Sequence, residues 1–232
     1  MKIALIGYGA MGKLIERLAT EKGHEIAVVI DDTDANLFAG ELAKKLRGCD
    51  VAIDFTIAMA VRRNVEACVT ASIPIVVGTT GWNDQVGEIE QIVKDGNGSM
   101  VFGANFSIGV NLFYRIVDHA SELFAKFAEY ETFLEEQHHS RKRDAPSGTA
   151  LKIQNIVAKH IKKDFSVSAT RAGNIPGTHR VGFDGPADQI LLEHTARSRE
   201  GFAFGAILAA EWIVGKKGFY EFTGVMDEVL SQ

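Results

Sequence analysis

The chain has little cysteine, little proline and no long uninterrupted hydrophobic segment. Its 232 residues include only two cysteines, Cys49 and Cys68, and four prolines. So few cysteines exclude a disulfide framework, fit a reducing cytoplasm and are expected to be small buried side chains. The apolar run at residues 3–6 is too short for a signal peptide, and no run reaches the roughly 18 residues of a membrane span. The sequence therefore predicts a soluble cytoplasmic protein with no membrane partner.

A surplus of positive charge is also absent. The net charge of −5 argues against a general nucleic-acid binder, which is normally basic over its surface. Hydrophobic residues make up 46% of the chain and charged residues 24%, the balance of a globular protein with a core. No internal repeat and no proline-rich linker is visible. Any positively charged site must therefore be local.

The first residues combine a strand, a glycine turn and a helix. The apolar run "KIALIG" leads into "GYGAMG", and "KLIERLATEKG" follows with helical spacing of its apolar residues. Gly7, Gly9 and Gly12 match G-x-G-x-x-G, in which the glycines allow a tight turn, close approach of a pyrophosphate, and close packing of helix on strand. The helix start supplies N–H donors to the phosphates. The segment from Gly7 to Gly12, including Tyr8, Ala10 and Met11, is thus predicted to bind a dinucleotide.

Two acidic residues follow the second predicted strand, "EIAVVIDD". Asp31 lies at the distance from the glycine turn where a carboxylate meets the adenosine ribose hydroxyls. No lysine or arginine follows before Lys44, so a 2′-phosphate would face Asp31 and Asp32 without a cation to offset them. We therefore expect NADH to be preferred, with NADPH as the weaker alternative.

Strands and helices continue to alternate up to residue 105. Residues 50–56, 73–81 and 99–105 read as buried strands, and residues 58–72 and 84–95 read as helices. This pattern predicts a parallel sheet covered on both faces, a Rossmann-type fold that binds ligands beyond the carboxyl ends of its strands. Two such ends are rich in small residues and are expected to line the nicotinamide side of the cofactor: Gly78, Thr79 and Thr80, and Gly103, Ala104, Asn105 and Phe106.

The pattern changes after residue 105. A long helix over residues 107–127 precedes the alternating segment 129–139, and "FSVSATRAG", "HRVGFDG" and "DQILLEHTARS" alternate in the same way. Alternation predicts a mixed or antiparallel sheet with a more polar face. We expect an α/β protein in which residues 1–105 and 205–232 form the dinucleotide-binding domain and residues 106–204 a second α+β domain, with the apolar helix 202–216 leading back to the first.

Residues 135–150, "EEQHHSRKRDAPSGTA", concentrate titratable and positively charged groups before a helix. Ser147 is a natural N-cap, and the first N–H groups of the helix, at Gly148 and Thr149, point toward any anion placed before them. Such a segment suits a small substrate with several negative charges, and His138 can exchange a proton near neutral pH. The cationic and imidazole residues just upstream are His138, His139, Arg141, Lys142 and Arg143.

This segment has two other interpretations. A metal site needs spaced ligands, and adjacent histidines without a third placed ligand favour no metal. The run "SRKR" is also typical of a solvated surface or an RNA-contacting patch. The glycine turn and the helix start together favour the substrate site.

This segment, together with "GYGAMG", "VVGTTG", "GANFSIGVN" and "RAGNIPGTH", resembles the 4-hydroxy-tetrahydrodipicolinate (dihydrodipicolinate) reductases of lysine and diaminopimelate biosynthesis over nearly the whole chain. The resemblance implies a Rossmann domain, a substrate-binding and tetramerisation domain, and a homotetramer. It implies hydride transfer from NAD(P)H to the dehydrated cyclic dicarboxylate. It assigns His138 as general acid/base and Lys142 as proton donor. The implied substrate ligands are His139, Lys142, Ser147, Gly148 and Thr149.

The sequence departs from that family at the adenosine side. Members that use NADPH well usually carry a basic residue beside the ribose acid, where this chain has Asp32. The segment between Asp32 and Asp50 is also short for the family. Neither departure touches the segment from His138 to Thr149.

Two other functions remain open from the residues alone. An amino-acid or homoserine dehydrogenase-like enzyme shares the Rossmann start but needs no His-His and "DAPSGTA" combination. A nucleotide-sensing regulator should carry a DNA-reading helix and a basic face, and neither is visible.

Overall fold

The computed structural model describes residues 1–231. The chain forms two compact units, one made of residues 1–108 with the chain from residue 200 onward, and one made of residues 109–199. Residues 200–204, which we expected in the second domain, thus belong to the first unit, because helix α7 (Glu200–Ile213) begins there. The chain therefore re-enters the first unit at the first residue of this helix.

The first unit is built on a six-stranded parallel sheet, which confirms the predicted Rossmann-type fold. Its strand order is β10-β5-β4-β3-β1-β2, so β1 lies between β2 and β3. Successive strands are added first on one side of β1 and then on the other, so the strand order reverses there. Ligands bind at such a reversal in sheets of this kind. The strands are β1 (Lys2–Ile6), β2 (Glu25–Ile30), β3 (Val51–Asp54), β4 (Ile75–Val77), β5 (Ser99–Phe102) and β10 (Gly218–Glu221).

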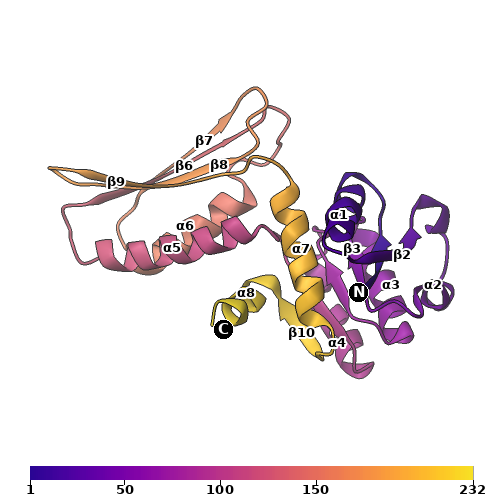
Figure 1. The fold of residues 1–232 in the computed structure, drawn as a ribbon. Helices are drawn as coiled ribbons and strands as arrows, with labels where there is room; N and C mark the ends of the chain where they lie inside the picture. The colour runs from indigo at the N-terminus through magenta and orange to yellow at the C-terminus, as the bar shows by residue number, and fades with distance from the viewer. Residues whose placement is uncertain (232) are drawn as a thin grey trace. The chain divides into compact units, whose positions relative to one another are not determined.

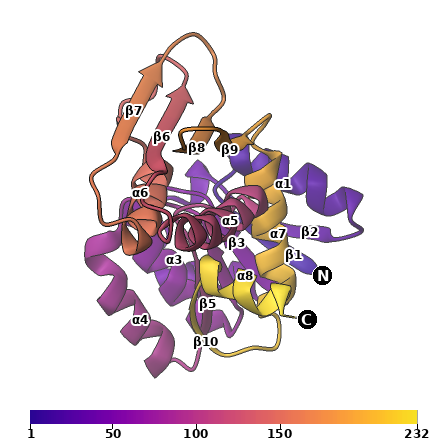
Figure 2. The ribbon, with the colours of Figure 1, turned by 90° about the vertical axis from the view of Figure 1, so that its left-hand side faces the viewer.

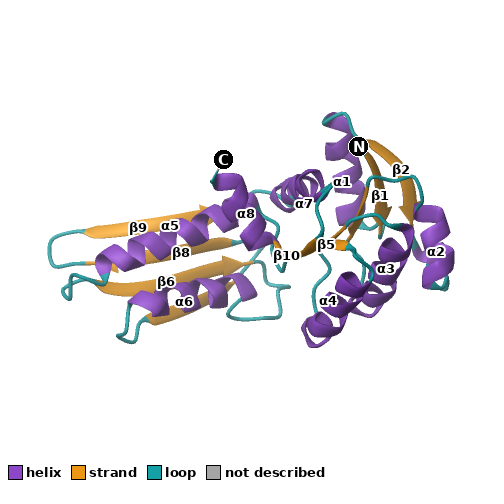
Figure 3. Ribbon diagram, turned by 90° about the horizontal axis from the view of Figure 1, so that it is seen from below, coloured by secondary structure: helices purple, strands orange, loops and turns teal. Residues whose placement is uncertain are grey.

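Helices cover both faces of this sheet (Figure 3), which is why the central strands β3 and β4 are buried throughout. Helices α1 (Ala10–Glu21) and α7 contact each other on one face (Figures 1 and 2). Helices α2 (Ala39–Leu46), α3 (Ala58–Ala71) and α4 (Val86–Asp95) pack in sequence on the other. Short 3₁₀ turns occupy Asp32–Asp34 and Asn83–Gln85, and α8 (Phe222–Leu230) ends the described chain. Cys49 and Cys68 are free and buried in this unit, as predicted.

The second unit is a four-stranded mixed sheet with two helices on one face (Figures 1 and 3). The order is β7-β6-β8-β9, with β6 and β7 parallel and the other pairs antiparallel. Helices α5 (Ile108–Phe124) and α6 (Gly148–His160) share a core with Leu134, Val181 and Phe183. The strands are β6 (Glu131–His138), β7 (Ser166–Arg171), β8 (Thr178–Asp184) and β9 (Gln189–Thr195). The mixed sheet expected from the alternating pattern is confirmed.

Three elements were not foreseen: α2, β10 and α8. Helix α2 is only 8 residues long, and its apolar signal reduces to Leu42, Ala43 and Leu46, which are buried. Strand β10 has 4 half-buried or exposed residues at the edge of the sheet, so its sequence shows neither a buried run nor an alternation. Among residues 1–231, no helix combines the length and the apolar character that crossing a membrane requires.

Candidate active site

The glycine turn between β1 and α1 has the conformation that its sequence predicts. Gly7 has φ +92°, a backbone conformation that residues with a side chain rarely adopt. A Cβ on Gly12 would lie 2.3 Å from the Gly7 carbonyl oxygen, so helix and turn pack too closely for any other residue. A Cβ on Gly9, in contrast, would meet nothing within 4 Å. The fold itself does not require glycine at position 9, so the open space there is available to a ligand.

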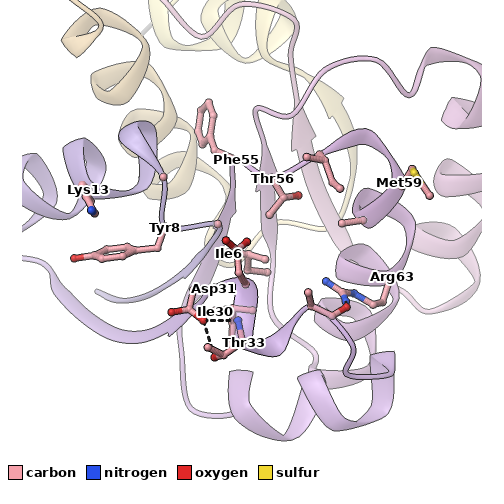
Figure 4. A pocket seen from close by; sticks show the side chains of 16 residues that line it. Ile6, Tyr8, Lys13, Ile30, Asp31, Thr33, Phe55, Thr56, Met59 and Arg63 are labelled. Atoms are coloured by element: carbon pink, nitrogen blue, oxygen red, sulfur yellow. Dashed lines mark hydrogen bonds between the residues drawn. The ribbon is translucent and has the colours of Figure 1, made fainter.

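Beyond this turn lies a pocket of 680 Å³ at the carboxyl ends of β1, β2 and β3 (Figure 4). Gly7, Tyr8, Gly9 and Asp31, all predicted cofactor ligands, line it. Asp31 accepts hydrogen bonds from the amide (2.9 Å) and the hydroxyl (2.7 Å) of Thr33, and these bonds lower the pKa of its carboxyl. Asp31 therefore caps the following 3₁₀ turn and also presents an ionised carboxylate to the pocket.

Two cations that the sequence argument missed line the same pocket. Lys13 lies with its Nζ 5.7 Å from the centre of the Tyr8 ring, and Arg63 extends from α3 (Figure 4). The guanidinium of Arg63 is already hydrogen-bonded to Ala35 O and Leu37 O and to the Asn64 side chain. The positive charge of Arg63 is therefore fixed at the rim of the pocket and is not free to move toward a ligand. No local sequence pattern indicates that Lys13 and Arg63 line the same pocket as Asp31 and Asp32.

The other predicted cofactor residues follow from the same elements but do not line this pocket. Ala10, Met11 and Gly12 begin α1. Gly78, Thr79 and Thr80 follow β4, and Gly103, Ala104, Asn105 and Phe106 follow β5. Because all these strands are parallel, both loops lie along the same edge of the sheet as the pocket. The ring of Phe55 packs on Gly78, where a Cβ would lie 2.2 Å from it, and forms an edge contact with Phe106.

A dinucleotide fits this edge of the sheet. No side chain among the described residues caps the start of α1, so its first N–H groups can bind an anion. The open space at Gly9 admits a pyrophosphate, and the Asp31 carboxylate can accept hydrogen bonds from ribose hydroxyls.

In the second unit, the predicted substrate residues converge where β6 ends and α6 begins. The Ser147 hydroxyl accepts a hydrogen bond from the Ala150 amide, so Ser147 is the N-cap that the sequence predicted. Gly148 at the helix start is exposed and His139 is partly buried. Thr149 hydrogen-bonds the buried phenol of Tyr114, whose pKa burial raises to about 12. The helix start is therefore firmly anchored.

Lys142 pairs with an acidic neighbour in the loop before α6. Its ammonium lies 2.8 Å from Asp144 Oδ1, and the hydrogen bond from Lys142 lowers the pKa of the Asp144 carboxyl. The ammonium that we predicted to bind a substrate carboxylate therefore already pairs with a carboxylate of its own loop.

Behind this surface lies a buried carboxylate that the sequence analysis did not single out. Glu136 is 1% exposed; its Oε1 accepts from Arg171 (2.6 Å) and from the Ser147 amide (2.9 Å). Its Oε2 lies 3.3 Å from His138 Nδ1 and 3.6 Å from His179 Nε2. Burial alone would raise the pKa of Glu136, but the bonds from Ser147 and Arg171 outweigh it and lower the pKa. Glu136 therefore joins the end of β6 to β7, β8 and α6.

The two imidazoles beside Glu136 are held in the neutral form. Burial lowers the pKa of His138 from its ordinary value, although Glu136 opposes this change. Burial lowers the pKa of His179 further, to about 4, and repulsion from His138 adds to the shift. His138 is 8% exposed, so the residue that we predicted as acid/base lies just beneath the surface.

Glu136, His138 and His179 also form a group of potential metal ligands, with ligand atoms within 4.8 Å of one another. This is a third ligand set that the adjacent histidines did not suggest. The positive charge of Arg171 on the same carboxylate disfavours a divalent cation there. The absence of a metal stays a prediction.

The sequence analysis missed several functional candidates because no motif within their own segments marks them. Glu136 continues the alternation of Thr132 and Leu134, so period two alone would have placed it in the core. His179 and Arg171 lie on strands β8 and β7, which are distant in sequence and come together only through sheet pairing with β6. Phe55, Thr56 and Arg63 carry no motif.

At the level of class, the glycine turn and the pocket beside it at the carboxyl edge of a parallel sheet are those of a dinucleotide-dependent oxidoreductase.

The chain belongs to the dihydrodipicolinate reductase family, the 4-hydroxy-tetrahydrodipicolinate reductases of lysine biosynthesis. The N-terminal part of the family pattern matches residues 1–106 and the C-terminal part residues 109–226. The 4-hydroxy-tetrahydrodipicolinate reductase of Christiangramia forsetii is 35% identical over 241 residues, 99% of each chain. That of Archaeoglobus fulgidus is 35% identical over 270 residues, 99% of this chain and 100% of the relative.

A solved structure has the same fold along the chain. Dipicolinate-bound dihydrodipicolinate reductase from Paenisporosarcina sp. TG-14 superposes with a TM-score of 0.81, covering 97% of this chain and 99% of the other at 20% identity. At this identity the likeness concerns the fold.

Proposed function

We propose that the chain transfers a hydride from NADH to the dehydrated form of 4-hydroxy-tetrahydrodipicolinate, giving tetrahydrodipicolinate for diaminopimelate and lysine synthesis. The observation that carries this proposal is the pairing of the Lys142 ammonium with a carboxylate, that of Asp144, in the loop that leads into α6. A cyclic dicarboxylate offers the same carboxylate chemistry to the same ammonium. Substrate binding would displace the Asp144 carboxylate from Lys142.

The chain's own residues contribute position, charge and a proton. When bound, the reduced nicotinamide supplies the hydride at its C4 atom. The amides of Gly148 and Thr149 and the side chain of His139 hold the substrate carboxylates. The Ser147 hydroxyl, which is buried against Ala150 and His179, supports these amides as the N-cap of α6. Lys142 stabilises negative charge that develops on the ring nitrogen–carbon system and then donates a proton to it.

His138 serves as the second proton-exchanging group. Its Nδ1 lies 3.3 Å from Glu136 Oε2, a proximity without a hydrogen bond between these two atoms. Since burial lowers its pKa, His138 is neutral at neutral pH and can accept a proton. After Lys142 has given its proton to the ring, His138 can take a proton from solvent and pass it to the Lys142 amine, which restores the ammonium.

We further propose that NADH is preferred over NADPH. Asp31 and Asp32 both line the pocket, and the guanidinium of Arg63, which also lines it, is engaged by backbone carbonyls. A 2′-phosphate would therefore meet two carboxylates and would have to recruit Lys13. Comparing kcat/KM for NADH and NADPH tests this point, and a higher value for NADPH would contradict it.

The nicotinamide half is assigned to the loops after β4 and β5, Gly78–Thr80 and Gly103–Phe106. Residues 1–105 with the C-terminal segment would bind the cofactor, and the unit containing β6–β9 would bind substrate and carry the contacts of a homotetramer. A cytoplasmic location fits the proposed pathway.

The test is a coupled assay on the purified full-length chain. Dihydrodipicolinate synthase supplies the substrate, and oxidation of NADH is followed at the nicotinamide absorbance band. We expect NADH loss only when the synthase and its substrates are present. NADH oxidation with a free amino acid or homoserine instead would favour the dehydrogenase alternative, and tight NADH binding without any turnover would favour a cofactor sensor.

A further inference from the structure

Asp54, the last residue of β3, is a buried carboxylate in the first unit that the proposed chemistry does not use. Its side chain is 0% exposed. Burial raises the pKa of this carboxyl, while hydrogen bonds from Asn64, Thr56 and Thr79 oppose the change. A fully buried carboxylate destabilises the fold unless each of its oxygens accepts a hydrogen bond.

Both oxygens of Asp54 are satisfied by donors. Oδ1 accepts from the Thr56 amide (2.9 Å), the Thr56 hydroxyl (2.7 Å) and the Thr79 hydroxyl (2.9 Å). Oδ2 accepts from Asn64 Nδ2 (2.8 Å). Every bond has Asp54 as acceptor, so the network is built for the ionised carboxylate.

This network connects the loops that follow β3 and β4. The Thr56 amide also donates to the Thr79 hydroxyl at 2.7 Å, so Thr79 is held from two sides and is only 7% exposed. Asn64 in turn accepts from Arg63 Nε (3.2 Å) and Nη2 (3.0 Å), and Arg63 lines the adenosine pocket. A continuous chain of hydrogen bonds thus runs from the pocket, through Asn64 and Asp54, to the loop Gly78–Thr80.

We propose that Asp54 is a positioning residue for the cofactor, holding the loop Gly78–Thr80 in the conformation that binds the nicotinamide half. The proposal rests on the placement of the nicotinamide half under Proposed function. Asp54 does not touch the cofactor; it acts through Thr79, whose buried hydroxyl orients the loop backbone while Asn64 ties the same carboxylate to α3.

The test compares two ligands on the full-length chain: NADH, and ADP-ribose, which lacks the nicotinamide ring. In Asp54→Asn the three donors to Oδ1 can remain, but the new amide faces Asn64 Nδ2, donor against donor. Asn64 cannot simply turn over, because its oxygen is engaged by Arg63. We expect NADH affinity to fall about tenfold, the size of one to two net hydrogen bonds, and ADP-ribose affinity to change by less than about twofold.

The double variant Asp54→Asn/Asn64→Asp provides the rescue. It places the amide at position 54 on β3 and the carboxylate at position 64 on α3. That carboxylate can then accept hydrogen bonds from both the new amide and Arg63. NADH affinity should then return to within about twofold of the wild type. Asp95→Asn, an exposed acid at the end of α4, is the matched control and should change neither affinity. Should Asp54→Asn fail to fold, Thr79→Val and Thr79→Ser replace it, because only the serine keeps the hydroxyl.

Unchanged NADH affinity in Asp54→Asn, or in Thr79→Val, would overturn the proposal. An equal loss for NADH and ADP-ribose would also overturn it, since that result indicates general damage. Binding is measured without substrate, so a failure of the proposed reaction in the coupled assay would leave this result standing.

Discussion

Lys142 is the residue on which the proposed proton transfer depends most. Replacement by alanine removes both the ammonium that stabilises developing charge and the proton that it donates. We expect Lys142→Ala to lower kcat by about a hundredfold or more, whereas the Kd for NADH stays near the wild-type value because the glycine turn lies in the other unit.

Arg141 supplies the matched control for this experiment. It is an adjacent, exposed cation that hydrogen-bonds Asn174 at 3.0 Å. Arg141→Ala removes the same charge from the same loop and should leave kcat within about threefold of the wild type. Near-normal turnover in Lys142→Ala would remove Lys142 from the mechanism.

His179 makes the stability of the fold depend on pH. Its pKa is about 4 in the folded chain against an ordinary value of 6.5, so the unfolded chain binds the proton first. Stability is then highest above the unfolded pKa and falls as pH drops from about 6.5 toward about 4. This side chain alone should cost about 2 kcal/mol between about pH 7.5 and about pH 5.

Urea unfolding at those two pH values measures the effect. The variant His179→Gln keeps a polar side chain but has no titrating ring, so its free energy of unfolding should change less over the interval. An identical pH dependence in the variant and the wild type would show that His179 is not the group responsible.

At the scale of an element, the turn into α1 contains one glycine that the fold requires, Gly12, and one that we expect to serve ligand binding, Gly9. A Cβ at position 12 would overlap the Gly7 carbonyl oxygen, whereas a Cβ at position 9 meets nothing within 4 Å. We expect Gly12→Ala to lower the melting temperature by several degrees. Gly9→Ala should melt like the wild type but bind NADH at least about tenfold more weakly. A large loss of stability in Gly9→Ala would contradict this division.

The elements that the sequence predicted are those with a strong apolar period. Strand β6 alternates, and strands β1, β3 and β4 are apolar apart from Lys2 and Asp54 at their ends, so their sequences predict both their existence and their class of sheet. Strand β10 could not be predicted, because its edge position leaves Tyr220 and Glu221 free of any burial pattern. Element ends also shifted: the long helix expected at 107–127 ends at Phe124.

For the whole molecule, we expect a homotetramer. Helices α5 and α6 cover one face of the four-stranded sheet, and on the other face Leu191 is 47% exposed beside Phe133, which packs on Gly182. Light scattering of the purified chain should give about four times its mass of 25.2 kDa. Leu191→Lys should shift the mass toward smaller species, and a wild-type monomer would contradict the expectation.

The candidate site was predictable only where its residues are neighbours in sequence. The segment from His138 to Thr149 supplies the imidazole, the ammonium and the helix start within one loop, so its sequence alone suggests this site. Glu136 could be inferred from the alternation of β6, but its partners Arg171 and His179 come from other strands. Sheet register, which no single segment specifies, brings them together.

The most direct measurement of the central claim follows the hydride itself. The purified chain is supplied with NADH deuterated at C4 on the transferred face and with substrate from dihydrodipicolinate synthase, and the product is analysed by mass spectrometry. The proposed reaction predicts one deuterium in the tetrahydrodipicolinate product for each NADH oxidised, and little product from Lys142→Ala. A product without deuterium, or NADH that stays reduced in the presence of substrate, would contradict the account.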